Sequence, residues 1–498
     1  MVTVIERKPS PAPSGPVSAA ETARRKEAGG LTHLYKPRTP IHPKLVHGKW
    51  RNVKWAMLIF TLGIYYLTPW IRCNRPGNLP DQAVLIDFAH ARFYFFFLHL
   101  WPQEVYFITG LLVMSALALF LATSLFGRLW CGYSCPQTIW TDFFITIERL
   151  FEGDRNARIR MDAAPWSFDK VWRKIAKHAT WLMIGFWTGG AWVLYFHDAP
   201  TVVRQFWTGT AEPSVYISFA VLTLTTYSFA GLMREQVCFY LCPWPRIQGA
   251  MLDKDSLQVT YLRDRGEPRG PHKKDDTWEG RGECIDCNQC VVVCPMGIDI
   301  RNGSQFECIN CGLCVDACNE MMDKIGRPRD LMGYDTDAAV AARACGTKPV
   351  YRPIRPRTIY YAVALTSVTG LMLWGLTHRA EAYANAIRDR NPVFVRMKDG
   401  SVRDGFTLKI SNRALTPQTF MVSVKGLEGA TLHAPGGVSG VTIPILAPAD
   451  STRGIKVFVI APPDEMRRAS IPITFTAVSP EISATARATF QSSMEIDR

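Results

Sequence analysis

Eight cysteines stand in two closely spaced runs in the middle of the chain. The runs comprise Cys284, Cys287, Cys290 and Cys294, followed by Pro295, and then Cys308, Cys311, Cys314 and Cys318. Three thiolates so close together can bind three irons of one cubane cluster, but the fourth iron needs a distant ligand, which two-cluster ferredoxins take from the other run. We therefore predict two 4Fe-4S clusters, one bound by Cys284, Cys287, Cys290 and Cys318 and the other by Cys308, Cys311, Cys314 and Cys294.

Zinc and disulfide bonds are the alternative uses of so many cysteines. Zinc sites use four ligands in two widely spaced pairs, which the tight, repeated spacing matches poorly. Disulfides need an oxidising compartment, and the topology predicted below places this region in the cytoplasm. Asn319 follows the last cysteine where the first run has a proline, which changes the local turn and not the ligand set.

A second cysteine motif, C-x3-C-P, occurs twice, each time directly after an apolar run. The pairs are Cys131 with Cys135, and Cys238 with Cys242. This spacing places both sulfurs of a pair on one face of a helix, and the proline after each pair suits the start of the next helix. Two matched hairpins indicate a parallel internal repeat, in which all four thiols meet at the centre of a bundle. We predict that these four cysteines are catalytic and form a soft metal site suited to Cu(I).

The same four cysteines have other possible uses. Cysteine is common in apolar interiors, so they could simply be packing residues. Zinc or a transient disulfide is also open. One pair alone would favour packing, whereas two matched pairs favour a metal or redox role.

Five apolar runs are predicted to cross a membrane, because each approaches or exceeds the length that a bilayer requires. They are Trp55–Ile71, Val105–Phe126, His178–Phe196, Val215–Met233 and Thr358–Thr377. An aromatic block between the first two runs is interrupted by Arg92, His99 and Pro102, so it is not predicted to cross. The tryptophans at positions 130, 140, 166, 172 and 181 are expected to form an interfacial belt.

The charge pattern predicts the sidedness of these runs. The 498 residues carry a net charge of +14, with 57 Lys and Arg against 43 Asp and Glu. The cations stand mainly beside the apolar runs, which is typical of cytoplasmic loops and argues against nucleic-acid binding. The N-terminus and the region Arg234–Arg357 are therefore placed in the cytoplasm and the C-terminus outside. All of the 14 cysteines except Cys73 then lie on the cytoplasmic side, where thiols stay reduced.

Changes in composition divide the chain into domains. Residues 1–43 have no apolar run and are expected to form a disordered cytoplasmic tail. Residues 44–252 are predicted to form a four-helix transmembrane bundle, 253–357 a cytoplasmic ferredoxin-like domain, and 358–377 a fifth transmembrane helix. In residues 391–498, short alternating segments broken by Gly and Pro predict an extracytoplasmic β-sandwich of immunoglobulin type. The expected fold class is a multi-domain membrane protein with a five-span α-helical bundle.

Longer stretches of the chain resemble the cytochrome c oxidase accessory proteins called CcoG, also known as FixG or RdxA. The matching stretches are Arg75–Asp87, Phe93–Phe96, Trp101–Gln103, Gly127–Asp142, Ile147–Arg149, Glu152–Arg155, Cys238–Met251, both cluster runs and Ile325–Pro328. The likeness runs from about residue 33 into the terminal sandwich.

This resemblance implies a bacterial inner-membrane protein that helps to assemble a cbb3-type haem-copper oxidase. The implied activity is reduction of Cu(II) to Cu(I). By position, the C-x3-C-P cysteines match the family's membrane-edge motifs, and the eight ferredoxin cysteines match its cluster ligands. The expected partners are membrane lipid, a cytoplasmic electron donor, and copper-delivery and oxidase assembly proteins. A homo-oligomer is left open, and no nucleic acid is expected.

Two other functions are open on the sequence alone. A quinol-oxidising module of the NapH type would pass electrons from the membrane pool to a partner protein. A non-enzymatic scaffold would use its clusters for structure only and would dock the oxidase through its outer sandwich.

Overall fold

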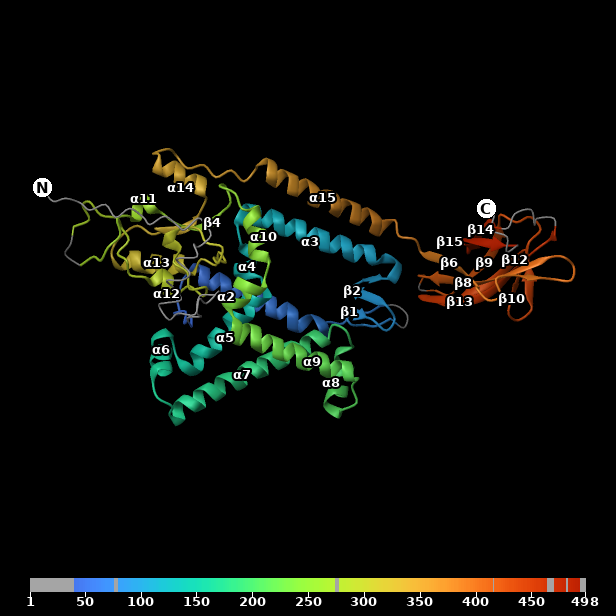
Figure 1. Cartoon of the computed structure of the whole chain (residues 1–498), viewed down its shortest axis with the longest axis horizontal. Coiled ribbons are helices and arrows are strands. Elements are labelled where there is room, and N and C mark those ends of the chain that lie inside the picture. Colours follow the sequence, from blue (N-terminus) through green and yellow to red (C-terminus); the bar gives the residue numbers. More distant parts are fainter. Residues whose placement is uncertain are drawn as a thin grey trace, which may run out of the picture.

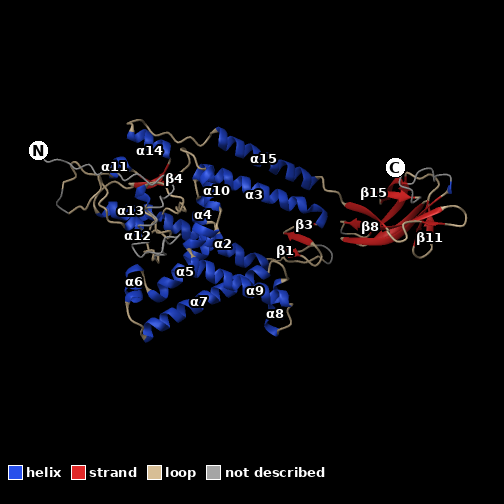
Figure 2. Cartoon of the chain, viewed as in Figure 1, coloured by secondary structure: helices blue, strands red, loops and turns tan. Residues whose placement is uncertain are grey.

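The computed structural model describes residues 40–75, 79–273, 277–414, 416–463, 470–480 and 482–492. The predicted cytoplasmic tail comprises residues 1–43, and residues 1–39 of it lie outside the described residues. Helices form most of the molecule, and strands dominate the C-terminal end (Figure 2). The cysteine-rich region and the C-terminal β-domain lie at opposite ends of the long helices (Figure 1).

Long helices occupy all five predicted spans. They are α2 (Lys49–Leu67), α3 (Val105–Phe126), α7 (Phe168–Val193), α9 (Pro213–Thr226), which continues as the π-helix η3 (Tyr227–Met233), and α15 (Pro356–Thr377). Within the described residues, three segments are long and apolar enough to cross a bilayer: Pro102–Phe126, Pro213–Met233 and Pro356–Thr377. The helices α2 and α7 begin with turns that carry several Lys and Arg residues, which lowers their apolar content. The five-span count stays a prediction.

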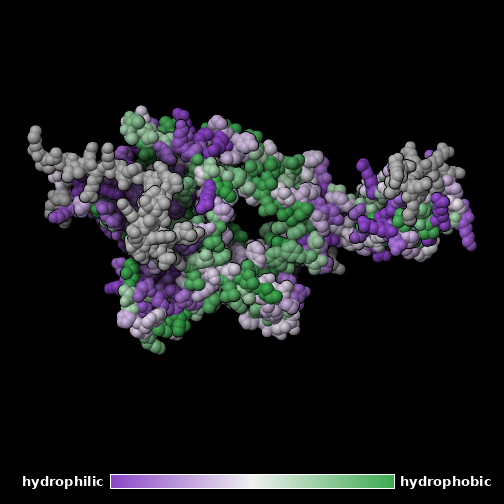
Figure 3. Space-filling view, viewed as in Figure 1, coloured by the Kyte–Doolittle hydropathy of each residue, from purple (hydrophilic) through white to green (hydrophobic). Residues whose placement is uncertain are grey.

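The long helices pair differently from the predicted four-helix bundle of residues 44–252. The helix α3 packs along α15, where Gly110 faces the side chain of Met372. The helix α7 packs on α9, with Gly189 against Thr223. Glycine lets helix backbones approach closely in lipid. The space-filling view shows an open gap with largely hydrophobic walls near α3 (Figure 3). The main partner of α3 is therefore the fifth helix.

Shorter helices connect the long ones at the cysteine-rich end. They are α4 (Leu129–Tyr133), α5 (Pro136–Glu152), α6 (Arg155–Ala163), the π-helix η4 (Val237–Leu241) and α10 (Trp244–Met251). The apolar face of α5 packs on α7 through Ile139, Trp140 and Phe144, which share a core with Trp181. Trp140 and Trp181 are buried in this core. The expectation that these two tryptophans belong to an interfacial belt was therefore wrong.

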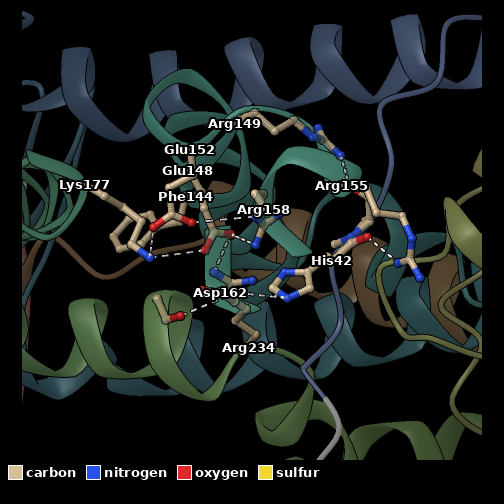
Figure 4. A network of polar contacts seen from close by, with 12 residues as sticks. His42, Phe144, Glu148, Arg149, Glu152, Arg155, Arg158, Asp162, Lys177 and Arg234 are labelled. Carbon is tan, nitrogen blue, oxygen red and sulfur yellow. Dashed lines mark hydrogen bonds and ion pairs between the residues drawn. The ribbon is translucent and has the colours of Figure 1, made fainter. Parts of the chain in front are cut away.

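A buried network of charges joins α5, α6 and α7 (Figure 4). Glu148 lies 2.5 Å from Arg158, 2.6 Å from Arg234 and 3.5 Å from Lys177. Burial alone would raise the pKa of Glu148, but the three cations outweigh it and lower the pKa below its ordinary value. Glu148 therefore stays charged and ties Arg234 to α5 just before the second membrane-edge cysteine pair begins at Cys238.

A three-stranded antiparallel sheet lies at the opposite end of the helices. It consists of β1 (Val84–Asp87), β2 (Arg92–Phe95) and β3 (Leu98–Leu100), and is followed by the short η2 (Pro102–Glu104). The aromatic block between the first two predicted spans forms part of this sheet. Arg75 donates hydrogen bonds to the carbonyl oxygens of Gln82 and Ala83, just before β1 begins. The helix α8 (Ala199–Thr208) lies at the same end.

The C-terminal domain is a sandwich of two antiparallel sheets, as predicted. One sheet has the order β11-β10-β13-β8-β6, with β7 beside β8, and the other has the order β12-β9-β14-β15. The strands are β6 (Ala382–Arg388), β7 (Val395–Arg396), β8 (Val402–Asn412), β9 (Gln418–Lys425), β10 (Thr431–Ala434), β11 (Val438–Gly440), β12 (Thr442–Ala447), β13 (Ser451–Ala461), β14 (Ser470–Val478) and β15 (Ser483–Gln491). Alternate residues point inward, so Phe406, Phe420, Phe475 and Phe490 are fully buried between the sheets.

Buried ion pairs fix the sandwich to the rest of the molecule. Glu104, at the end of η2, has no exposed surface and lies 2.9 Å from Arg413 and 3.2 Å from Arg379. Arg92 of β2 pairs with Asp450 at 2.6 Å, and both side chains are largely buried. The sandwich is therefore held in one orientation relative to the three-stranded sheet of β1, β2 and β3.

The cysteine-rich region consists of short helices around a two-stranded antiparallel sheet. Its elements are β4 (Gln258–Tyr261), α11 (Arg263–Gly266), α12 (Gln289–Val292), η5 (Ile300–Asn302), α13 (Leu313–Lys324), β5 (Met332–Asp335) and α14 (Asp337–Ala344). Asp316 of α13 accepts the backbone N–H groups of Trp50 and Arg51 at 3.2 and 2.8 Å. A carboxylate in this position satisfies the free donors of a helix N-terminus. This contact explains why α2 begins at Lys49 rather than at Trp55.

We expect Glu148→Gln to destabilise the protein by about 3–5 kcal/mol, because the change leaves buried cations without their counter-charge. Thermal unfolding of the purified protein in detergent would show the loss as a lower Tm. Glu320→Gln is the matched control, since Glu320 pairs with the exposed Lys324 one turn away, and such a pair contributes about 0.3–0.5 kcal/mol. Equal Tm values for the two variants would contradict a structural role for the buried network.

Candidate functional site

The two cysteine runs fold into loops of the same shape. In each run, the residues on both sides of the second cysteine adopt the left-handed conformation. These residues are Asp286 and Asn288, with φ of 54° and 56°, and Asn310 and Gly312, with φ of 57° and 71°. Glycine, Asn and Asp reach this conformation more readily than other residues. The repeated turns give both runs a tight loop of the kind that three neighbouring ligands of one cluster require.

The folded chain brings the fourth cysteine of each run to the other run. One group of thiols within electrostatic range of one another consists of Cys318 with Cys284, Cys287 and Cys290. The other consists of Cys294 with Cys308, Cys311 and Cys314. Cys314 also lies within range of Cys290 of the first group. We call the second one the proximal group, because it lies nearer to the membrane-edge cysteines. Both groups correspond to the crossed ligand sets expected from the spacing, and the ligation itself stays a prediction.

The surroundings of the thiols fit iron–sulfur clusters. The proximal group lines one internal cavity together with apolar side chains such as Ile298 and Leu313. The backbone N–H of Asn310 donates to Sγ of Cys308 at 3.4 Å, and hydrogen bonds to the sulfurs tune a cluster's potential. Burial raises the pKa of the Cys308 and Cys318 thiols to about 12. These thiols are therefore protonated at neutral pH unless a metal holds them as thiolates.

The membrane-edge cysteines lie where helices break. Cys131 lies in α4 and Cys238 in η4, whereas Cys135 and Cys242 are extended and directly precede a proline. The residue before a proline avoids the helical conformation. The two sulfurs of a pair therefore do not share one helix face, contrary to the prediction. Pro136 begins α5, as expected for a proline at a first helical position.

The fold nevertheless gathers the four membrane-edge thiols. Cys131 lies within electrostatic range of the other three, and Cys135 also interacts with Cys242. Burial raises the pKa of the Cys131 and Cys238 thiols to about 12. The Cys131 thiol donates to Oε1 of the fully buried Gln248 at 3.0 Å. Gln248 stands outside the cysteine motifs, so no spacing rule pointed to it.

The spacing of the four thiols decides how a metal could bind to them. Among the residues that the structure describes, no three His, Cys, Asp or Glu side chains lie close enough to hold one metal ion. A cubane binds each thiolate through a different iron, so it tolerates wider spacing than one ion does. The expectation that Cys131, Cys135, Cys238 and Cys242 form a soft metal site suited to Cu(I) stays a prediction.

The membrane-edge cysteines pack directly on the proximal group. Cys131 and Cys238 share one apolar core with Cys294, Cys311 and Cys314. Within the described residues, no separate domain or layer of helices stands between the two sets of thiols. A redox partner at the membrane edge would therefore be adjacent to the proximal group.

Close backbone packing and hydrogen bonds fix this contact. A Cβ atom on Gly132 would lie 2.6 Å from the carbonyl oxygen of Ile309, so only glycine fits between Cys131 and Tyr133. The Tyr133 hydroxyl donates to the carbonyl oxygen of Cys311 at 3.0 Å. The Arg128 guanidinium likewise donates to the carbonyl oxygen of Cys308 at 3.2 Å.

A large apolar cavity lies at the opposite end of the helices, near the three-stranded sheet. It measures about 530 Å³ and is lined by residues of α2, α7, α8 and α9, including Trp187 and Phe206. Tyr66 also lines it, but the Tyr66 hydroxyl already pairs with Oγ1 of Thr188 at 2.8 Å. Its position, away from the thiols, does not favour the quinol-oxidising alternative.

The fold and the site together define a membrane-bound iron–sulfur electron-transfer protein. Three family models match the chain: a 4Fe-4S dicluster domain over residues 233–337, a 4Fe-4S binding domain over 108–152, and an IG-like fold at the C-terminal of FixG over 372–493. The dicluster model contains all eight cysteines of the two runs.

Relatives with similar sequences cover nearly the whole chain. The nitrogen fixation protein FixG of Rhizobium meliloti is 46% identical over 479 residues, which are 90% of this chain and 91% of that one. Protein RdxA of Cereibacter sphaeroides is 48% identical and protein RdxB 47% identical, each over 432 residues, which are 86% of this chain and 91% and 90% of theirs. The chain belongs to the FixG/RdxA family.

We expect Gly132→Ala to separate α4 from the cluster loop, because the added methyl group would meet the carbonyl oxygen of Ile309. Overpacking of this kind costs about 1–3 kcal/mol, so the Tm should fall. The control is Gly63→Ala in α2, where an added Cβ meets nothing within 4 Å and alanine favours the helix. A Gly132→Ala protein as stable as Gly63→Ala, with an unchanged visible spectrum, would rule out the close contact.

Proposed function

We propose that this protein is a membrane-bound electron carrier that reduces Cu(II) to Cu(I) during assembly of a cbb3-type cytochrome c oxidase. The observation that carries the proposal is the shared core in which Cys131 and Cys238 pack with three cysteines of the proximal group. A copper ion at the membrane edge would have sulfur ligands on one side and an electron source on the other.

The proposed reaction transfers one electron and no atoms. Bound 4Fe-4S clusters supply a store of single electrons. A cytoplasmic reductant provides each electron, and the substrate Cu(II) accepts it and becomes Cu(I). Thiolate sulfur favours the softer Cu(I), so the cysteines at positions 131 and 238 retain the product until a copper-delivery protein takes it. The apolar core around them keeps water away from the thiols.

The proposed orientation places the cysteine-rich end in the cytoplasm and the sandwich in the periplasm of a bacterial inner membrane. Lys and Arg gather at the cysteine-rich ends of the long helices, and examples are Arg51, Lys54 and Lys177. Such an excess favours the cytoplasmic side. In this orientation the electron donor meets the cluster region, and oxidase assembly proteins can reach the sandwich.

Cys131→Ser and Cys238→Ser should each abolish Cu(II) reduction while leaving the iron content of the protein unchanged. A serine hydroxyl keeps the size of the side chain but removes the soft ligand. The measurement is Cu(I) formation by the pre-reduced protein, followed with a Cu(I)-specific chelator in the absence of oxygen. Cys345→Ser is the control, because Cys345 is exposed and lies outside both sets of thiols.

Two outcomes would reject the copper proposal. If both variants reduce Cu(II) at the rate of the unchanged protein, the membrane-edge thiols are not the acceptor site. If instead variants in the proximal group lose their iron, still insert into the membrane and support normal oxidase activity, the protein acts as a scaffold rather than as a reductase.

The orientation is open to a protease test. With one tag at each end of the chain, proteinase K added to spheroplasts should remove the C-terminal tag and spare the N-terminal tag. Lysis before digestion should remove both tags. Protection of the C-terminal tag in intact spheroplasts would contradict a periplasmic sandwich.

A further inference from the structure

The arrangement of the membrane-edge thiols leaves a copper ion short of sulfur ligands. Among the described residues, no three His, Cys, Asp or Glu side chains form a group that could hold one metal ion. Methionine sulfur is also a soft ligand and suits Cu(I). A thioether beside one of the thiols would therefore complete a small soft site.

A small cavity beside Cys238 holds such a thioether. Cys238 and Met296 both line it, together with Ile309 and residues of α5. The cavity measures about 20 Å³, which is room for one ion and not for an ion with its water shell. An ion that enters must exchange water for protein ligands.

Met296 lies between the two sets of thiols. It is 6% exposed and follows Cys294 by two positions. It lines both the cavity beside Cys238 and the cavity that the proximal group shares. It also belongs to the apolar core that contains Cys131. Leucine would fill a similar volume, so the sulfur atom is what distinguishes methionine at this position.

Four charged side chains line the cavity, namely Lys54, Asp142, Arg234 and Glu235. Asp142, which lines it, lies 2.9 Å from Arg51 of α2. Arg234, which also lines it, lies 2.6 Å from Glu148. Lys54 lies 3.7 Å from Asp142, and Glu235 accepts a hydrogen bond from Gln236 at 3.3 Å. The Cys238 thiolate adds one negative charge to this cavity, which the charge of Cu(I) would balance.

We propose that the Met296 thioether and the Cys238 thiolate together hold Cu(I) in this cavity. On binding, Cu(I) replaces the thiol proton of Cys238, which passes to solvent, and the Met296 sulfur donates a lone pair without breaking a bond. Met296 is thus a ligand that lies on the side of the proximal group. This inference rests on the proposed copper reduction and adds a thioether ligand beside the Cys238 thiolate.

The test is the affinity of full-length protein in detergent for Cu(I), measured without oxygen by competition with a Cu(I) chelator. Met296→Leu should weaken binding about tenfold or more, by analogy with the 10–100-fold loss on removing even the supporting groups of a metal site. Met322→Leu is the matched control, because Met322 is as deeply buried but lies in the core around the other cysteine group. Iron content and visible spectrum should be equal in all three proteins.

The outcomes separate this inference from the proposed function. If Met296→Leu binds Cu(I) like the unchanged protein while Cys238→Ser does not bind it, the Met296 ligand is rejected and copper reduction at the thiols stands. If Cys238→Ser also binds Cu(I) normally, the thiol site is rejected with it.

A second measurement covers the case in which Met296→Leu loses iron or fails to fold. Protein with unchanged sequence and selenomethionine in place of methionine, loaded with one Cu(I), should show a copper–selenium distance in X-ray absorption at the copper edge. A copper shell that contains only sulfur from cysteine, with no selenium, would overturn the proposal.

Discussion

The direct contact between the α4 backbone at Gly132 and the cluster loop at Ile309 is the constraint on which the rest of the structure depends. The proposed electron transfer to the membrane-edge thiols requires that nothing bulky separates them from the proximal group. A glycine between Cys131 and Tyr133 removes the one side chain that would hold the two backbones apart. The Tyr133 hydroxyl and the Arg128 guanidinium then bond to carbonyl oxygens of that same loop.

Two further contacts stabilise the packing of α4 on the cluster loop. Asp316 joins the helix α13, which carries a cysteine of each group, to the first turn of α2. Glu148 holds Arg234, and through it the second cysteine hairpin, against α5. Each of these contacts joins a charged side chain to a helix end, and their burial makes them costly to break. The cysteine-rich region therefore packs as part of the helical assembly and is not a separate domain on a linker.

Local chemistry could be predicted from the sequence, and spatial partners could not. Cysteine spacing predicts which thiols can share a cluster, and the alternation of apolar and polar residues predicts the strands of a sandwich. Both patterns lie within short stretches of the sequence. The pairing of α3 with α15 depends on Gly110 meeting Met372, two residues far apart in the chain. The prediction that Cys131 and Cys135 share one helix face assumed an unbroken helix. Pro136 already indicated that the helix breaks there. Gln248 and Met296 belong to no spacing pattern, so only the folded chain places them beside the thiols.

The ion pairs of Glu104 limit how the C-terminal sandwich can move relative to the long helices. A carboxylate without exposed surface, bound by Arg379 and Arg413, resists swivelling of the domain about the end of α15. The side chain of Met372 on α15 also packs against Gly110 on α3. Because α3 leads directly into α4, the ion pairs of Glu104 and the thiol of Cys131 stand at opposite ends of one helix.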